Sequence, residues 1–178
     1  MKRPRGFLGH RRGEGGFTLV ELMMVVALLG VGFGWITQLF LNTYQLWKRA
    51  FDELILQQQV RQSMAVMTKA LRECKPGSAT VDTPAGEPVY STIRFTDGRN
   101  NWWVFKQSKS KLYAVHRQGA GSATDMLCSN VDAVAFLYPS FQDLTLVDVS
   151  ITARKLPYAR APKAIVLQLV ERVMMRNP

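Results

Sequence analysis

Glu21 is the single charged residue in an apolar segment from Phe17 to Ile36, in which Thr18 is the other polar residue. A carboxylate in the middle of a membrane helix costs roughly 2.5 to 3.5 kcal/mol, so we expect a positive charge to compensate it. A cut after Gly16 would give Phe17 a free amino group, and an ammonium and a carboxylate attract strongly where the dielectric constant is low. A new amino terminus is therefore the candidate partner of the Glu21 carboxylate.

The segment around this acid has the properties of a membrane anchor behind a short basic leader. Twenty helical residues span about 30 Å, the thickness of the hydrocarbon layer. Residues 1–16 carry a net charge of +4 within a chain of +10. A secretory signal peptide has its small residues after the apolar segment, whereas Gly15 and Gly16 precede it here, so a cut at this point would retain the anchor. The positive-inside rule places the leader in the cytoplasm and the rest of the chain outside it.

Residues Gly16 to Glu21 resemble the processing site of type IV prepilins and type II secretion pseudopilins. Glycine precedes the cut, phenylalanine follows it, and glutamate is the fifth residue of the remaining chain. The resemblance implies that prepilin peptidase cuts after Gly16 and methylates Phe17, and that Glu21 pairs with the amine of an adjacent subunit. It also implies membrane lipid, an inner-membrane assembly platform, the major pilin and other minor pilins or pseudopilins as partners. A single-pass membrane protein with no filament role is the alternative.

A second, looser resemblance covers the carboxyl-terminal half. The segments Cys128 to Tyr138, Val147 to Ile151 and Val173 to Asn177 are similar to the closing strands of J-type minor pseudopilins and W-type minor pilins. This resemblance implies a minor subunit near the filament end that primes or caps the polymer of a pilus or a secretion pseudopilus. The implied location is the inner membrane, single-pass with the globular domain in the periplasm, and then a periplasmic pseudopilus or an extracellular pilus.

The sequence predicts an α+β, pilin-like fold in which a long amino-terminal helix packs on an antiparallel sheet domain. No proline interrupts the chain between Phe17 and Pro76. We expect a leader at 1–16, a transmembrane and assembly helix at 17–41, its amphipathic continuation at 42–75, and a sheet domain at 76–178. Period-two patterns predict strands over 89–95, 102–107, 111–117, 131–138, 144–152 and 163–175.

Two apolar stripes follow the continuation of the helix, on roughly opposite faces. The later stripe is expected to pack on the chain's own sheet and the earlier one on neighbouring subunits. The alternative is that both face the same domain through a bend. The earlier stripe consists of Tyr44, Trp47, Phe51, Leu54 and Ile55, and the later one of Leu56, Val60, Met64, Met67 and Leu71.

Cys74 and Cys128 would lie outside the cytoplasm, where disulfides persist. We therefore expect a bridge between them, with two unpaired buried thiols as the alternative. Two cysteines and His116, the one histidine after the leader, lack the spacing of metal ligands, so neither a metal nor another cofactor is expected. The carboxylates form no close pair and no serine elbow or phosphate-binding loop is present, so we expect no enzymatic activity.

One group of neighbouring aromatic and basic residues favours the binding of a ligand or a partner protein. Trp102 and Trp103 lie between Arg99 and Lys106, and aromatic rings among cations suit single-stranded nucleic acid. Adjacent strand residues point to opposite faces, so one tryptophan is expected in the core. Contact with DNA, as in a DNA-uptake pilus, contact with a partner subunit, and plain packing all remain open, with nucleic acid the less favoured. Residues 153–163 carry four cations and two prolines and are expected to form a solvated hairpin tip or a docking element.

Overall fold

The computed structural model describes residue 16 and residues 18–75, 77–118, 121–140, 145–157 and 163–175. The chain divides into two units, Met1–Leu46 and Trp47–Pro178. One helix, α1 (Leu19–Arg72), contributes to both of them. Phe17 and the leader before Gly16 lie outside the described residues.

The part of α1 that belongs to the first unit has no buried residue, and its apolar side chains are exposed throughout. By length and composition, α1 is the one helix among the described residues that could cross a membrane. The prediction of a long amino-terminal helix is confirmed.

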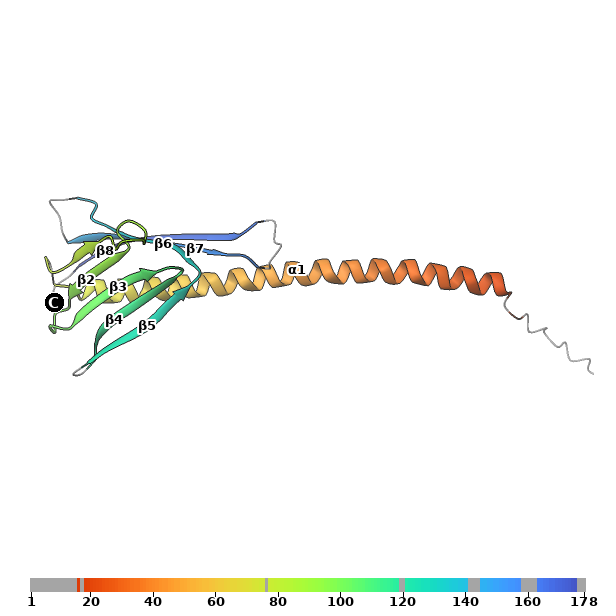
Figure 1. Cartoon of the computed structure of the whole chain (residues 1–178), viewed down its shortest axis with the longest axis horizontal. Coiled ribbons are helices and arrows are strands. Elements are labelled where there is room, and N and C mark those ends of the chain that lie inside the picture. The colour runs from red at the N-terminus through yellow and green to blue at the C-terminus, as the bar shows by residue number, and fades with distance from the viewer. Residues whose placement is uncertain are drawn as a thin grey trace, which may run out of the picture. The chain divides into compact units, whose positions relative to one another are not determined.

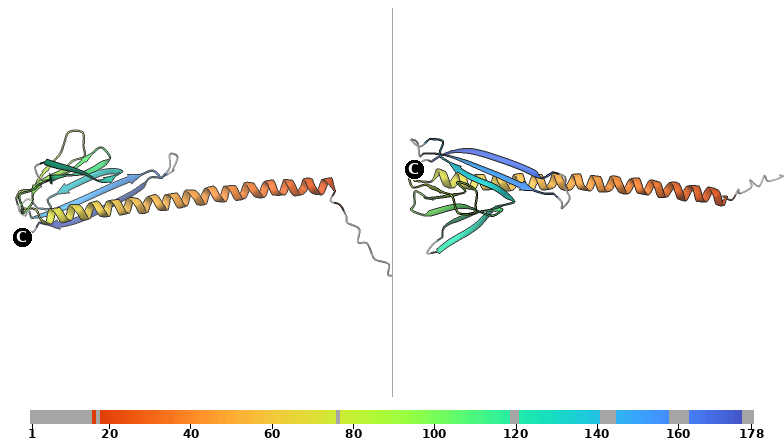
Figure 2. Two further views of the ribbon diagram at one scale, coloured as in Figure 1. Left: turned by 90° about the horizontal axis from the view of Figure 1, so that it is seen from below. Right: turned by 45° about the horizontal axis from the view of Figure 1, so that its top comes forward.

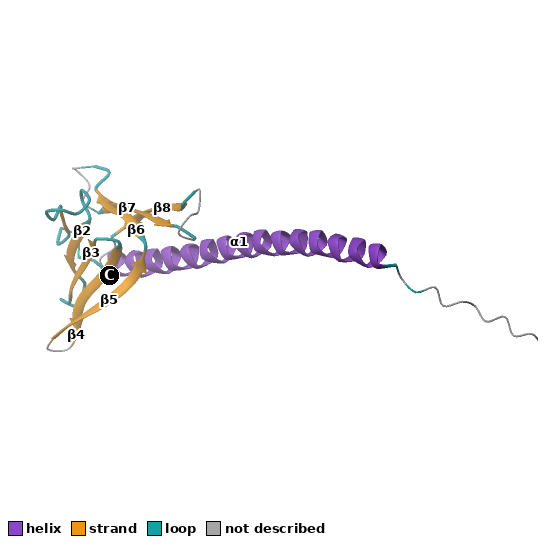
Figure 3. Cartoon of the chain, turned by 45° about the vertical axis from the view of Figure 1, so that its right-hand side comes forward, coloured by secondary structure: helices purple, strands orange, loops and turns teal. Residues whose placement is uncertain are grey.

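The second unit contains two antiparallel sheets that lie along the second half of α1 (Figures 1 and 3). The fold is therefore α+β, as predicted. The five-stranded sheet has the order β1-β2-β3-β4-β5 and the three-stranded sheet has the order β6-β7-β8. Their strands are β1 (Thr80–Asp82), β2 (Thr92–Thr96), β3 (Trp102–Ser108), β4 (Lys111–Gln118), β5 (Gly121–Ser129), β6 (Val131–Leu137), β7 (Leu146–Lys155) and β8 (Ile165–Met174).

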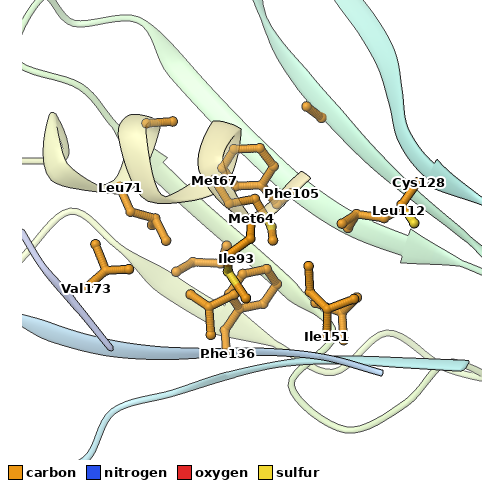
Figure 4. Packing of buried hydrophobic residues seen from close by; sticks show 14 of the residues in the cluster. Met64, Met67, Leu71, Ile93, Phe105, Leu112, Cys128, Phe136, Ile151 and Val173 are labelled. Atoms are coloured by element: carbon orange, nitrogen blue, oxygen red, sulfur yellow. The ribbon is translucent and has the colours of Figure 1, made fainter. Parts of the chain in front are cut away.

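The later stripe of α1 belongs to the core of this unit, and Figure 4 shows three of its members, Met64, Met67 and Leu71, among side chains of the sheets. Leu56, Val60, Met64, Met67 and Leu71 each expose at most 1% of their surface. Burying a side chain of this kind contributes about 1.5 to 3 kcal/mol. They pack among Ile93, Phe105, Phe136, Ile151 and other buried side chains from both sheets.

Most of the earlier stripe remains on the surface of the described chain, whereas Ile55 is partly buried. Trp47, Phe51 and Leu54 expose 61%, 49% and 63% of their surface. Trp47 and Phe51 stack on each other with ring centroids 5.3 Å apart and planes 9° from parallel. The later stripe is thus buried in the chain's own core while these residues of the earlier stripe are exposed. This agrees with the interpretation that the two stripes have different partners.

A buried glutamine joins the two sheets. Gln107 of β3 is 4% exposed and accepts a hydrogen bond at Oε1 from the N–H of Val134 in β6, at 2.8 Å. Its Nε2 donates to the carbonyl oxygens of Lys109 at 2.8 Å and Asp132 at 3.2 Å. One side chain thus satisfies backbone groups of both sheets at their junction.

Two strands and several strand ends differ from the sequence prediction. The strand predicted from residue 89 begins at Thr92, because Tyr90 has a positive φ of 57° and belongs to a turn. The three-residue β1 and the whole of β5 were not predicted, because β5 has mostly exposed, polar residues without a clean alternation. β7 continues to Lys155, so Ala153 to Lys155 belong to a strand and not to the predicted loop. Of the remainder of that loop, Leu156 and Lys163 are exposed and Pro157 is buried, and residues 158–162 lie outside the described residues.

The predicted disulfide is not formed, because Cys74 and Cys128 are both free, buried thiols. Cys74 forms an isolated bridge with Asp97 beyond the end of β2, whereas Cys128 lies in β5, three strands away in sheet order. Three strand spacings amount to about 14 Å, whereas bridged cysteines have Cα atoms within about 7 Å of each other. Burial raises the pKa of both thiols, although hydrogen bonds with Ser78 and Ser63 partly oppose this.

Candidate functional site

The start of α1 is closed by a side-chain cap that the sequence analysis missed. The N–H of Glu21 donates to the hydroxyl oxygen Oγ1 of Thr18 at 3.3 Å, and the N–H of Leu22 donates to the carbonyl oxygen of Thr18 at 3.1 Å. Thr18 is thus the N-cap, and Thr-x-x-Glu is the sequence of a capping box. The spacing of three residues between Thr18 and Glu21 was the available signal.

Glu21 is in the first turn of α1, where the positive end of the helix dipole favours an acid. Its own side chain is exposed, as are those of Leu19, Val20 and Leu22, at 76%, 67% and 57%. Among the described residues, no side chain forms an ion pair with its carboxylate. Within that part of the chain, the helix dipole is therefore the one compensation of this charge.

Gly16 is exposed, and a Cβ built on it would meet no atom within 4 Å. Its backbone is not in the left-handed region that favours glycine. The described chain therefore places no steric demand for glycine at this position. A demand for glycine would have to come from a protein that binds this segment.

A protein-family model described as the prokaryotic N-terminal methylation motif matches residues 11–37. The chain carries an N-terminal methylation motif. The motif indicates a type IV pilin-like substrate of prepilin peptidase, and the matched segment includes Gly16, Phe17, Thr18 and Glu21. The match ends at residue 37, so it describes the start of the chain and not the sheets. No curated protein matches the chain.

Outside the methylation motif, the structure divides the predicted tryptophan constellation between two faces of β3. Trp102 is 39% exposed and, by the alternation of the strand, shares the outer face with the exposed Lys106. Trp103 points inward, where its ring stacks on His116 with centroids 4.6 Å apart and packs against the core. Arg99 lines a groove with Trp103 on the α1 side. A single ligand on the outer face could contact Trp102 and Lys106 but not Trp103.

The turn that carries Arg99 is held by a buried carboxylate. Asp97 is 5% exposed and accepts hydrogen bonds from the backbone N–H groups of Arg99 and Asn101, each at 2.8 Å. The side chains of Asn101 and Trp103 also donate to it, at 3.2 and 3.4 Å. Burial acts to raise the pKa of Asp97, but these four donors outweigh it and hold the pKa below its usual value. Asp97 therefore acts as a structural anchor of the turn.

The remaining titratable groups include His116 and Asp125 of the five-stranded sheet. Within the described ranges, no group of three or more His, Cys, Asp or Glu side chains is arranged to hold a metal ion. His116 Nδ1 lies 3.7 Å from an Asp125 carboxylate oxygen and has no hydrogen-bond partner in that part of the chain. In the described part of the chain, His116 thus stacks on Trp103 and approaches Asp125.

Proposed function

We propose that the chain is a minor subunit of a type IV filament, either a pilus or a type II secretion pseudopilus. In this proposal, prepilin peptidase cuts after Gly16 and methylates Phe17. The mature subunit then joins other minor subunits near the filament end, where it helps to start or cap the polymer. The supporting observation is Glu21, an acid in the methylation motif whose carboxylate has no ion-pair partner among the described residues.

The chemistry of assembly follows from that unpaired charge. Before assembly, lipid covers the apolar side chains of Leu19 to Leu46, and the carboxylate of Glu21 is an energetic cost. When the subunit leaves the bilayer, the ammonium of Phe17 on a neighbouring subunit approaches this carboxylate. Removing one partner of a buried ion pair costs about 3 to 5 kcal/mol, because the other charge remains uncompensated. The pair therefore favours subunits that enter at the correct axial position.

The exposed part of the earlier stripe in the second unit also supports this proposal. Trp47, Phe51 and Leu54 are large apolar residues that stay exposed although they are next to a well-packed core. Contiguous exposed apolar side chains on a protein surface mark interaction sites. In a filament these side chains would contact the helices of neighbouring subunits, which would remove their surface from water.

The test replaces Glu21 and follows processing and assembly separately. Mass spectrometry of the membrane-extracted chain should show the loss of residues 1–16 and one added methyl group on Phe17. Glu21→Gln should still be cut, because the glycine before the cut is unchanged. Its incorporation into sheared filaments should fall about 100-fold, since roughly 3 kcal/mol of pairing corresponds to that factor.

Glu53→Gln is the matched control, because Glu53 is an exposed acid on the same helix that contacts Gln57 at 3.5 Å. This variant should be cut and incorporated like the natural chain. An uncut natural chain would refute the processing step. Normal incorporation of Glu21→Gln would refute the pairing step.

A further inference from the structure

Four strands lie at the edges of the two sheets, and three of these edges are protected. β1 has three residues. β5 is polar and exposed, and its register with β4 shifts at Leu112 and Tyr113. β6 bonds to the other sheet, because Phe136 N–H donates to Tyr90 O at 3.0 Å and Val134 N–H donates to Gln107 Oε1 at 2.8 Å. Short length, irregularity and coverage are the usual means by which proteins prevent edge pairing.

The fourth edge, β8, is long and regular and is not covered by any described residue, although Glu171 and Arg172 place charges on it. Its ten residues pair with β7 in an unbroken register, without proline or a bulge. Val166, Val170 and Met174 expose 61%, 59% and 52% of their surface on its outer face. Among the described residues, no backbone hydrogen bond reaches β8 from the side opposite β7. In an edge strand, alternate residues direct their N–H and C=O groups away from the neighbouring strand, so β8 can accept another strand there.

A groove of about 520 Å³ runs between β8 and the last turns of α1, which lie beside each other in Figure 2. Met64, Ala65 and Leu169 supply its apolar lining. Thr68 also lines it and is 5% exposed, and its hydroxyl oxygen has no hydrogen-bond partner within the described chain. A buried hydroxyl without a partner is costly and suits a site that an additional polar group completes.

Three cations and two acids line this groove, namely Arg61, Lys69, Arg72, Glu73 and Glu171. Arg61 and Lys69 line it and form no ion pair with a described residue. Arg72 approaches Glu171 of β8 at 4.0 Å, and Glu73 lies at the far end of the groove. The two unpaired cations therefore favour acidic side chains on whatever occupies the groove.

We propose that β8 and this groove form a docking edge for an extended segment of a partner protein. The segment adds as a fourth strand beside β8, with acidic side chains facing Arg61 and Lys69 and apolar side chains beside Val166 and Val170. Main-chain hydrogen bonds provide affinity in such strand addition, and the alternate side chains provide specificity. This proposal does not depend on cleavage after Gly16, since all of its residues belong to the second unit.

The test uses the full chain in detergent micelles and two capped ten-residue peptides, one alternating valine with glutamate and the other alternating valine with lysine. The glutamate peptide should bind with a Kd below about 1 mM at low salt, and the lysine peptide at least about tenfold more weakly. Hydrogen exchange should show that the glutamate peptide protects the amides among residues 165–174 that point away from β7. Equal binding of the two peptides, no binding of either, or binding without this protection would overturn the proposal.

Charge-reversing variants locate the binding site. Arg61→Glu combined with Lys69→Glu should weaken binding of the glutamate peptide about tenfold or more, because two attractions become repulsions. Lys106→Glu combined with Lys111→Glu is the matched control, since both are exposed cations on the other sheet and the net charge changes equally. A similar loss in both double variants would show nonspecific attraction. Displacement of the peptide by inorganic phosphate would assign the groove to a small anion, and protection of β8 without peptide would assign it to a second copy. Each of these three results overturns the proposal.

Discussion

Replacement of Gln107 by alanine tests whether one side chain couples the two sheets. The change removes the acceptor of the Val134 N–H and the donor to the carbonyl oxygens of Lys109 and Asp132. Val134 is 0% exposed, so water cannot replace the lost acceptor without entering the core. An unsatisfied buried donor costs about 1 to 3 kcal/mol. Lys109 and Asp132 are exposed, so water can bond to their carbonyl oxygens at little cost.

The expected loss in the free energy of unfolding is therefore about 2 to 4 kcal/mol, which includes the space left by the side chain. Urea unfolding of a fragment of residues 47–178, followed by circular dichroism, measures it, since the buried core residues all belong to this unit. Gln168→Ala is the control, because Gln168 is an exposed strand glutamine and its loss should change stability by less than about 0.5 kcal/mol. Equal effects of the two substitutions would refute the coupling role of Gln107.

The remaining predictions concern the cysteines and two buried acids. In the native chain without reductant, alkylation of Cys74 and Cys128 should be slow, and unfolding in urea without reductant should expose both to rapid labelling; labelling that requires reduction would instead show a bridge. Asp97→Asn should destabilise the 47–178 fragment at pH 7. The pKa of Asp97 is lower in the folded than in the unfolded state, so its ionised form stabilises the fold fully above about pH 4. This stabilisation is lost as the pH falls through the folded pKa. The difference in the free energy of unfolding between the natural fragment and the variant should therefore be smaller at pH 3 than at pH 7. Asp52→Asn should cost about 1 to 2 kcal/mol in the same assay, because it breaks a 2.8 Å ion pair with the partly buried Lys155; no change in the urea midpoint would contradict this.

The sequence predicted α1 and its division into two stripes because both depend on local periodicity. Leu56, Val60 and Met67 repeat at helical spacing without proline, and this pattern survives folding unchanged. β3 and β4 were predicted from their alternation and from the turn residues between them. The cap at Thr18 is equally visible in the sequence, because Glu21 follows Thr18 at the spacing of a capping box.

Features that depend on distant segments were not predictable in the same way. β5 carries few apolar residues, and it is a strand because its backbone completes the edge next to β4. The order of the strands places β3 and β4 between the positions of Cys74 and Cys128, and no spacing in the sequence encodes this separation. The groove beside β8 likewise arises where two elements about one hundred residues apart in the chain approach each other.

The unbridged cysteines have a consequence for biogenesis. Both sulfur atoms are enclosed by a core that closes without a covalent crosslink, so formation of this unit consumes no oxidising equivalents. A cell that lacks its thiol oxidase should therefore still accumulate the folded chain at normal abundance, unlike secreted domains whose stability depends on such crosslinks.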